Sequence, residues 1–361
     1  MRLDDVVGHG RIRAILSRAL ERDRLPPALL LSGPEGVGKK LLALAAAQAA
    51  LCEQAPAAEP CGACRTCQKV SAAVGTERLQ KYREEADSHP DKDEWRNFRL
   101  HPDLILVEGW RLTKTGRPRP EPEIRVGQVR ALVSEVPGTP YEARRRVFIL
   151  DDAHSMNESS QNALLKSLEE PPPRSHLILV TSRPQRLRET IRSRCQVLRF
   201  GPLSREAVTT FLTERQGVPL EEARLRASLA AGSLGAALAF ESEAYKGMRE
   251  GLLSLLERIG DMDALARKEE AEMLEQADDP GLLLTTLRSL LRDVAALRSG
   301  AGAEALLNGD VAARLGPLAS GPLGARAADL AGAAGETRAA LRGFANKLLS
   351  FDILVDSLSH E

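Results

Sequence analysis

Val147-Phe148-Ile149-Leu150-Asp151-Asp152 decides the fold, and it opens a stretch that runs from Arg146 to Phe200. An unbroken apolar run that ends in acidic residues is typical of a parallel strand buried on both faces, with its charges at the carboxyl edge. A helix is predicted next, starting at the capping box Ser155 to Glu158 and stopping before Pro171. A second apolar run, Leu177 to Val180, is the next strand. This order predicts an α/β domain with a parallel sheet.

A phosphate loop is predicted near the amino end. The apolar run Ala28 to Ser32 leads into Gly33-Pro34-Glu35-Gly36-Val37-Gly38-Lys39-Lys40, and a helix is expected from Leu41 to Leu51. Glycines let backbone N–H groups curl around phosphate oxygens, and Lys39 can reach the terminal phosphates. A Mg²⁺-ligating hydroxyl should follow Lys39, but Lys40 stands there, and an ammonium group cannot ligate a metal. Nucleotide binding through Gly33, Gly36, Gly38 and Lys39 and a glycine turn without a ligand both remain open, and efficient ATP hydrolysis is not expected.

Three polar residues at predicted strand ends belong to the same candidate site, because ligands of open α/β sheets bind at the carboxyl ends of the strands. Asp151 stands where a metal-bound nucleotide needs a carboxylate, and Asp152 stands where a general base would orient water. Thr181 ends the following strand. The side chain of Asp152 is one methylene shorter than that of a glutamate base. Because a misplacement of ~1 Å can lower a rate by ~10²-fold, Asp152 would replace a glutamate poorly.

The composition is that of an ordinary globular protein: 361 residues, 43% hydrophobic and 28% charged. This length predicts two or three domains. Fifty basic and fifty acidic side chains cancel, which argues against a global field that attracts nucleic acid or an anionic membrane. The acidic start Met1-Arg2-Leu3-Asp4-Asp5 does not resemble a signal peptide, and no apolar run predicts a membrane span, so we expect a cytoplasmic location.

Four of the five cysteines are clustered, at positions 52, 61, 64 and 67, and Cys195 stands apart. In a cytosolic chain such clustering indicates a metal site rather than disulfides. Four thiolates can close a tetrahedron around Zn²⁺ with bonds of ~2.3 Å, and a closed shell is structural. An iron–sulfur cluster is the rival, but the spacing is not that of ferredoxins. The sequence therefore predicts a zinc module over residues 52–67, with Cys52, Cys61, Cys64 and Cys67 as ligands.

The segments outside the predicted sheet are charged or helical. Residues 76–100 read as a charged insertion with little apolar periodicity, and residues 112–123 read as a surface loop. Residues 202–242 predict a small helical domain, and residues 243–361 predict a helical bundle. We therefore expect three domains with boundaries near residues 201 and 242.

Three motifs resemble the AAA+ subunits of bacterial DNA polymerase III clamp loaders. They are Asp-Asp-Ala-His at 151–154, Asn-Ala-Leu-Leu-Lys-Ser-Leu-Glu-Glu-Pro-Pro at 162–172, and Ser-Arg-Cys at 193–195. The resemblance covers nearly the whole chain except residues 76–100. It implies a P-loop parallel-sheet domain with the zinc module inserted, then a lid domain and a collar domain that oligomerises. In ATP-hydrolysing relatives an arginine contacts the nucleotide where this chain has Gly235.

Within the family the chain best resembles the delta-prime kind of subunit, which combines a four-cysteine module, a degraded phosphate loop and an intact Ser-Arg-Cys. This resemblance implies a non-motor partner of gamma/tau and delta subunits, which together place a sliding clamp on primed DNA. Arg194 would be an arginine finger for the neighbouring ATP site, since a planar, always-charged donor can stabilise transferring phosphate. Pairing with surface carboxylates is the alternative for Arg194. Alternatives for the whole chain are a gamma/tau-like ATPase and a DNA-binding zinc protein.

Overall fold

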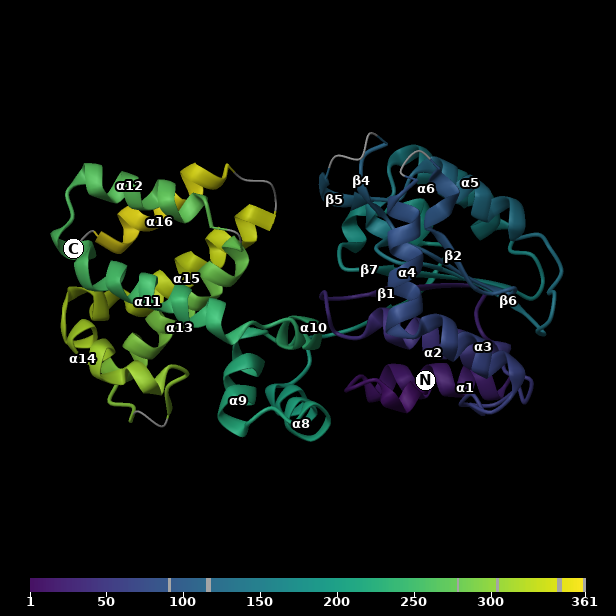
Figure 1. The fold of residues 1–361 in the computed structure, drawn as a ribbon, viewed down its shortest axis with the longest axis horizontal. Coiled ribbons are helices and arrows are strands. Elements are labelled where there is room, and N and C mark those ends of the chain that lie inside the picture. Colours follow the sequence, from purple (N-terminus) through teal and green to yellow (C-terminus); the bar gives the residue numbers. More distant parts are fainter. Residues whose placement is uncertain (90–91, 115–117, 278, 303–304, 343–345, 360–361) are drawn as a thin grey trace. The chain divides into compact units, whose positions relative to one another are not determined.

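The computed structural model describes residues 1–89, 92–114, 118–277, 279–302, 305–342 and 346–359. The chain divides into two compact units, one of residues 1–207 with 232–235 and the other of residues 208–231 with 236–361. The first contains the strands, drawn from purple to teal in Figure 1, and the second is helical, drawn in green and yellow. The three-domain division with boundaries near residues 201 and 242 stays a prediction.

A six-stranded sheet in the order β2-β3-β6-β7-β1-β8 forms the centre of the first unit. Its strands are β1 (Ala28–Ser32), β2 (Asn97–His101), β3 (Leu104–Val107), β6 (Arg146–Leu150), β7 (Ser175–Thr181) and β8 (Gln196–Arg199). Neighbouring strands are parallel except at the edge, where β2 runs antiparallel to β3. The predicted α/β class with a phosphate loop on a parallel sheet, followed by helices, is therefore confirmed.

Alternate residues of the buried strands face opposite layers, as the two-residue period of a strand requires. In β6, Val147 and Ile149 join the core beneath α1 (Gly10–Glu21) and α2 (Lys39–Leu51). Phe148 and Leu150 join the other core, beneath α5 (Val126–Glu135), α6 (Glu158–Glu169) and α7 (Glu189–Arg192). Because both faces are covered, the strands read as unbroken apolar runs.

The expectations for the segment between α2 and α5 were only partly right. The charged insertion folds into α4 (Thr76–Asp87), a 3₁₀ turn over Asp93–Arg96 and the edge strand β2, after α3 (Arg65–Val74). Residues 90 and 91 of the insertion lie outside the described residues. The expected loop at 112–123 was wrong at its ends, because β4 (Trp110–Leu112) pairs with β5 (Pro118–Glu123). Prolines and charges in β5 obscured its strand character.

The start of α6 also differs from the prediction. The helix begins at Glu158, and the capping residue is Asn157 rather than Ser155. The side-chain oxygen Oδ1 of Asn157 accepts the backbone N–H of Ser160 at 2.9 Å. Asparagine is as good a cap as serine, so two adjacent candidates made the boundary ambiguous.

The second unit is helical, and its helices from α11 onward share one apolar core. Residues 205–238 carry α8 (Arg205–Gln216), α9 (Leu220–Leu229) and α10 (Leu234–Leu238), and the bundle continues with α11 (Ser242–Arg258), α12 (Ala264–Glu275), α13 (Pro280–Arg298), α14 (Ala312–Ser320), α15 (Pro322–Arg342) and α16 (Lys347–Ser359). Pro280 at the start of α13 follows the cap Asp279, whose carboxylate accepts the N–H of Leu282 at 2.9 Å. None of the helices in the described part of the chain has the length and apolar character that crossing a membrane requires.

Candidate functional site

The phosphate loop lies where the sequence placed it, between the buried strand β1 and the start of α2. Gly33, Gly36 and Gly38 have φ angles of 152°, 71° and 96°, which L side chains rarely adopt. Lys39 is 6% exposed, and its Nζ donates to the carbonyl oxygen of Gly33 at 2.8 Å and to that of Pro34. Burial lowers the pKa of Lys39 from its usual value. The predicted loop is therefore formed, and its lysine is bonded to the loop's own carbonyls.

Gly235 contacts this loop directly. Its backbone N–H donates to the carbonyl oxygen of Gly36 at 2.9 Å. A Cβ atom at Gly235 would lie 3.0 Å from Cα of Gly36, and one at Gly36 would lie 2.2 Å from Oγ of Ser233. Besides leaving out the arginine found in ATP-hydrolysing relatives, the glycine at position 235 permits close backbone packing on the loop.

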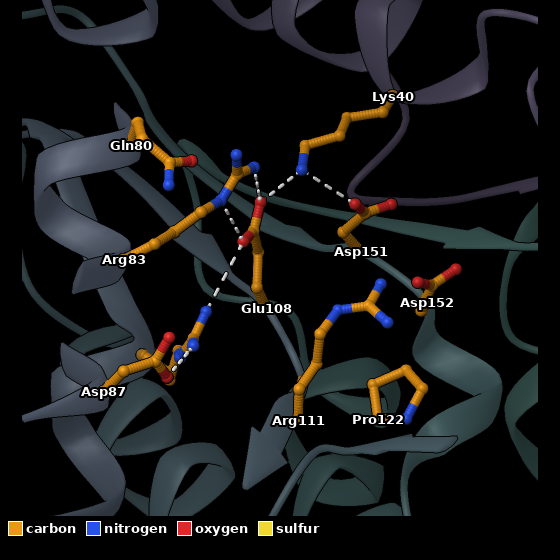
Figure 2. A pocket seen from close by; sticks show the side chains of 11 residues that line it. Lys40, Gln80, Arg83, Asp87, Glu108, Arg111, Pro122, Asp151 and Asp152 are labelled. Carbon is orange, nitrogen blue, oxygen red and sulfur yellow. Dashed lines mark hydrogen bonds and ion pairs between the residues drawn. The ribbon is translucent and has the colours of Figure 1, made fainter. Parts of the chain in front are cut away.

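Lys40 forms an ion-paired group with two carboxylates at the carboxyl edge of the sheet (Figure 2). Its Nζ lies 2.8 Å from Oδ2 of Asp151, which follows β6. It also pairs with Oε1 of Glu108, which follows β3. Burial disfavours the charge of Lys40, but Asp151 and Glu108 more than compensate and raise its pKa.

Glu108 receives further positive charge from the charged insertion. Nε and Nη2 of Arg83, on α4, donate to its two carboxylate oxygens at 2.9 Å and 2.7 Å. Arg96 lies 4.0 Å away and is itself paired with Asp87. Burial alone would raise the pKa of Glu108, but the bonds from Arg83 and the charge of Lys40 lower it to about 2. Glu108 is therefore ionised and fully paired.

These groups line a polar cavity of about 330 Å³, and Asp152 and Arg111 line it too (Figure 2). Asp152 has a φ of 49°, at the left-handed turn after β6. Burial, together with the charges of Asp151 and Glu35, raises its pKa to about 6. A carboxyl with that pKa can exchange a proton near neutral pH. Residue 40 is a lysine, so that position offers no hydroxyl that could ligate a metal.

A divalent cation does not fit between Glu108 and Asp151 as they stand. Mg²⁺ requires oxygen ligands at ~2.0–2.1 Å in octahedral geometry. The oxygens of Glu108 and Asp151 that would supply them are already bonded to the ammonium of Lys40. Lys40 offers only donors and no lone pair. The residues present thus disagree with the metal that a phosphate loop normally uses.

Thr181, predicted as a polar group at the end of β7, is fully buried rather than exposed. Its hydroxyl is hydrogen-bonded to Nδ1 of His154 at 3.2 Å and accepts the N–H of Arg183 at 3.1 Å. Its carbonyl oxygen accepts the N–H of Gly33 at 3.2 Å. The structure therefore brings Thr181 next to the phosphate loop, with its hydroxyl held in place.

Arg194 lies apart from the cavity, on the exposed turn between α7 and β8. Its Nη2 lies 2.8 Å from Oε1 of Glu169, the last residue of α6, and its Nη1 donates to the carbonyl of Thr190 at 3.0 Å. The side chain retains 35% exposure. The alternative noted above, a surface ion pair, is thus present in the free chain, and it leaves the guanidinium accessible.

The four clustered cysteines converge as predicted. The Sγ atoms of Cys52, Cys61, Cys64 and Cys67 all lie within 4.8 Å of one another. A tetrahedron with metal–sulfur bonds of ~2.3 Å has edges of about 3.8 Å, so small shifts would close it around an ion. Among the described residues this is the one His, Cys, Asp and Glu grouping with ligand atoms close enough for a metal. The cluster could therefore hold a metal ion.

Helix ends and backbone N–H groups position the four sulfurs. Cys52 is the C-cap of α2, and Cys64 caps the start of α3 by accepting the N–H of Cys67 at 3.4 Å. The N–H groups of Cys64 and Ala63 point at Cys61 and lower its pKa to about 7. Burial raises the pKa of Cys52 and of Cys67. One exposed thiolate beside buried thiols is a donor set that a soft cation would stabilise.

Comparison with known proteins identifies relatives of this chain. The family model described as "DNA polymerase III, delta subunit" matches residues 8–204. Subunit delta' of Bacillus subtilis is 34% identical over 61% of this chain and 55% of its own length. Subunit delta' of Pseudomonas aeruginosa is 34% identical over 68% of this chain and 64% of its own. Subunit tau of Bacillus subtilis is 27% identical over 85% of this chain and 52% of its own length. The matches thus span between half and two thirds of these relatives' own lengths.

Solved structures give a looser likeness. The RuvB Holliday junction branch migration motor of Thermotoga maritima has a TM-score of 0.39 at 15% identity and covers 86% of each chain. A DNA polymerase III gamma subunit-related protein of the same organism has a TM-score of 0.33 at 17% identity, over 96% of this chain and 98% of that one. The assignment of the fold therefore rests on the sheet order and the phosphate loop and not on these two structures.

Proposed function

The chain belongs to the DNA polymerase III delta-subunit family, and we propose on that premise that it is a non-motor, delta-prime-type subunit of a clamp loader. In this role it helps to place a sliding clamp on primed DNA, in a cytoplasmic complex with gamma/tau and delta subunits. The relatives named delta' and tau support a place in such a complex. The alternative is a gamma/tau-like subunit that hydrolyses ATP itself.

The observation that carries the non-motor reading is the ion pair between Lys40 and Asp151. A hydrolysing phosphate-loop enzyme uses Mg²⁺ to neutralise charge that develops on the phosphates, and a carboxylate together with a hydroxyl holds that ion. Here the carboxylate is paired with an ammonium, and the hydroxyl is absent. Lys39 and the glycines can still cradle a phosphate, so nucleotide binding without turnover fits this proposal.

Arg194 is the residue through which the chain would act on its neighbour. An arginine supplied in trans stabilises charge on a transferring phosphoryl group and contributes ~10³–10⁵-fold in rate where that role is established. Arg194 is accessible and lies on a turn fixed between two regular elements. Exchange of its contact with Glu169 for a partner's phosphate would then require only a side-chain movement.

The remaining parts have structural roles in this proposal. Zinc bound by Cys52, Cys61, Cys64 and Cys67 ties the end of α2 to the start of α3. Residues 243–361 supply the collar through which the subunits associate, and residues 202–242 form the lid. Asp152 and Thr181 belong to the nucleotide-binding remnant with the glycines and Lys39.

ATP turnover decides between the two functions. We expect no Mg²⁺-dependent hydrolysis by the purified chain, and DNA- and clamp-stimulated hydrolysis when gamma-type and delta subunits are added. Arg194→Ala should leave assembly intact and lower turnover at the neighbouring site by about 10³-fold. Arg192→Ala, at the exposed last residue of α7, is the matched control and should change little. Unchanged turnover with Arg194→Ala rules out the finger, and robust hydrolysis by the chain alone favours the motor.

A further inference from the structure

We propose that Lys40 and Arg83 are a built-in pair of positive charges that takes the place of a divalent cation between Glu108 and Asp151. The inference concerns which cation this pocket holds, and it does not depend on the clamp-loader assignment. It also gives the charged insertion a role, because α4 delivers Arg83.

The charges of the group balance. Lys40 and Arg83 contribute two positive charges, and Glu108 and Asp151 contribute two negative ones. The carboxylate side chains are only 12% and 17% exposed, so solvent screens them little. A divalent cation would bring the same formal charge to the same two carboxylates. The side chains therefore leave no net negative charge to attract one.

The positions of the donors agree with this substitution. Nζ of Lys40 lies between Oε1 of Glu108 and Oδ2 of Asp151, where an ion shared by the two carboxylates would lie (Figure 2). The ammonium is a compact point charge that can serve both oxygens at once. Arg83 approaches Glu108 from α4, on the far side from Asp151, and occupies both of its oxygens in bidentate geometry. Both oxygens of Glu108 and one oxygen of Asp151 are therefore bonded to positively charged side chains.

The second charge makes the arrangement stable. With Lys40 alone, two carboxylates would share a single counter-ion, and part of the buried negative charge would be unpaired. Burying an unpaired charge is costly, and Arg83 supplies the second counter-charge on Glu108. Lys40 alone still blocks the position between the two carboxylates. A phosphate ligand in the Gly33–Lys39 loop would accordingly bind as the free anion and not as its Mg²⁺ complex.

Binding of Mn²⁺, which has the same oxygen preference as Mg²⁺ and is paramagnetic, tests the proposal. The zinc-saturated full-length chain is titrated with Mn²⁺, and the free ion is followed by electron paramagnetic resonance. We expect the wild-type chain and Asp151→Asn to give the same curve. Lys40→Thr supplies a ligating hydroxyl and removes the ammonium that the two carboxylates share, so it should take up about one additional Mn²⁺ per chain.

Three variants sharpen the result. Lys40→Thr combined with Asp151→Asn should lose the added ion, and Lys40→Thr combined with Arg83→Gln should bind it more tightly than Lys40→Thr alone. Arg83→Gln alone should bind none, because Lys40 remains between the oxygens. A wild-type Mn²⁺ site that Asp151→Asn abolishes would overturn the proposal, and this comparison does not need the Lys40 variants to fold. A folded Lys40→Thr chain that gains no ion, or an Arg83→Gln chain that gains one, would overturn it as well.

Discussion

The cysteine cluster and the Lys40 pocket are two places where the sequence suggests a bound cation, and they differ in what surrounds the ligands. At the cluster, four sulfurs lie within 4.8 Å of one another, and those of Cys52, Cys61 and Cys64 accept backbone N–H groups. In the pocket, two carboxylates are already paired with the side chains of Lys40 and Arg83. The first arrangement calls for an external cation, and the second already contains its positive charge.

The difference teaches how a metal site should be judged. The kind and spacing of ligands are necessary, but the positive groups within hydrogen-bonding reach decide whether an ion has anything to neutralise. Asp151 alone would have suggested a magnesium site, since it follows a parallel strand beside a phosphate loop. The ammonium 2.8 Å away reverses that conclusion.

Loss of one cysteine ligand should have the largest effect. Structural zinc contributes ~10–16 kcal/mol of apparent binding free energy in small zinc peptides, so Cys67→Ser should remove the metal and lower the free energy of unfolding by at least several kcal/mol. Elemental analysis and urea unfolding measure both quantities. Cys195→Ala, a buried cysteine outside the cluster, should keep about one zinc. A wild-type chain that is folded without metal would mean that the cluster, like the Lys40 pocket, needs no external cation. Full zinc content in Cys67→Ser would mean that Cys67 is not a ligand.

Replacement of Glu108 should have an intermediate effect that depends on pH. The folded pKa of about 2 lies below the usual 4.5, so the carboxylate contributes stability above pH 4.5 and loses it as the pH falls toward 2. Glu108→Gln should cost about 2–3 kcal/mol at neutral pH, and the difference from wild type should shrink below pH 4.5. Urea unfolding of both chains at a series of pH values measures it. A difference that does not change with pH would mean that the charge of Glu108 is irrelevant.

The parts of the site that lie on local signals could be predicted from the sequence. The strands around Leu150 and Leu31, the glycine loop and the convergence of four cysteines all follow from short apolar runs and close spacings. Family membership is confirmed too, by the family model that matches residues 8–204, a range that contains the Ser-Arg-Cys and Asp-Asp motifs. The roles assigned to Arg194 and to the nucleotide-site residues stay predictions.

The part that could not be predicted depends on contacts between distant segments. Glu108 follows the apolar run of β3 just as Asp151 follows that of β6, so its position at the same edge was a signal that went unused. Arg83 carried no such signal. It lies in a charged segment without apolar periodicity, and its bond to Glu108 exists only because α4 packs over the pocket. Sequence patterns report burial well and report charge partners poorly.

Asp152 should show the smallest effect, with the opposite sign to Glu108. Its folded pKa of about 6 lies above the usual 3.8, so the folded state holds the proton more tightly, and ionisation costs stability as the pH rises from 3.8 to 6. Asp152→Asn removes that cost and should raise the free energy of unfolding by about 1–2 kcal/mol at neutral pH, relative to wild type. The gain should vanish near pH 4, where the wild-type carboxyl is protonated in the folded state. Urea unfolding at the two pH values measures the difference. Because the cause is burial beside Asp151 and Glu35, an equal gain at both pH values would show that Asp152 has no such environment.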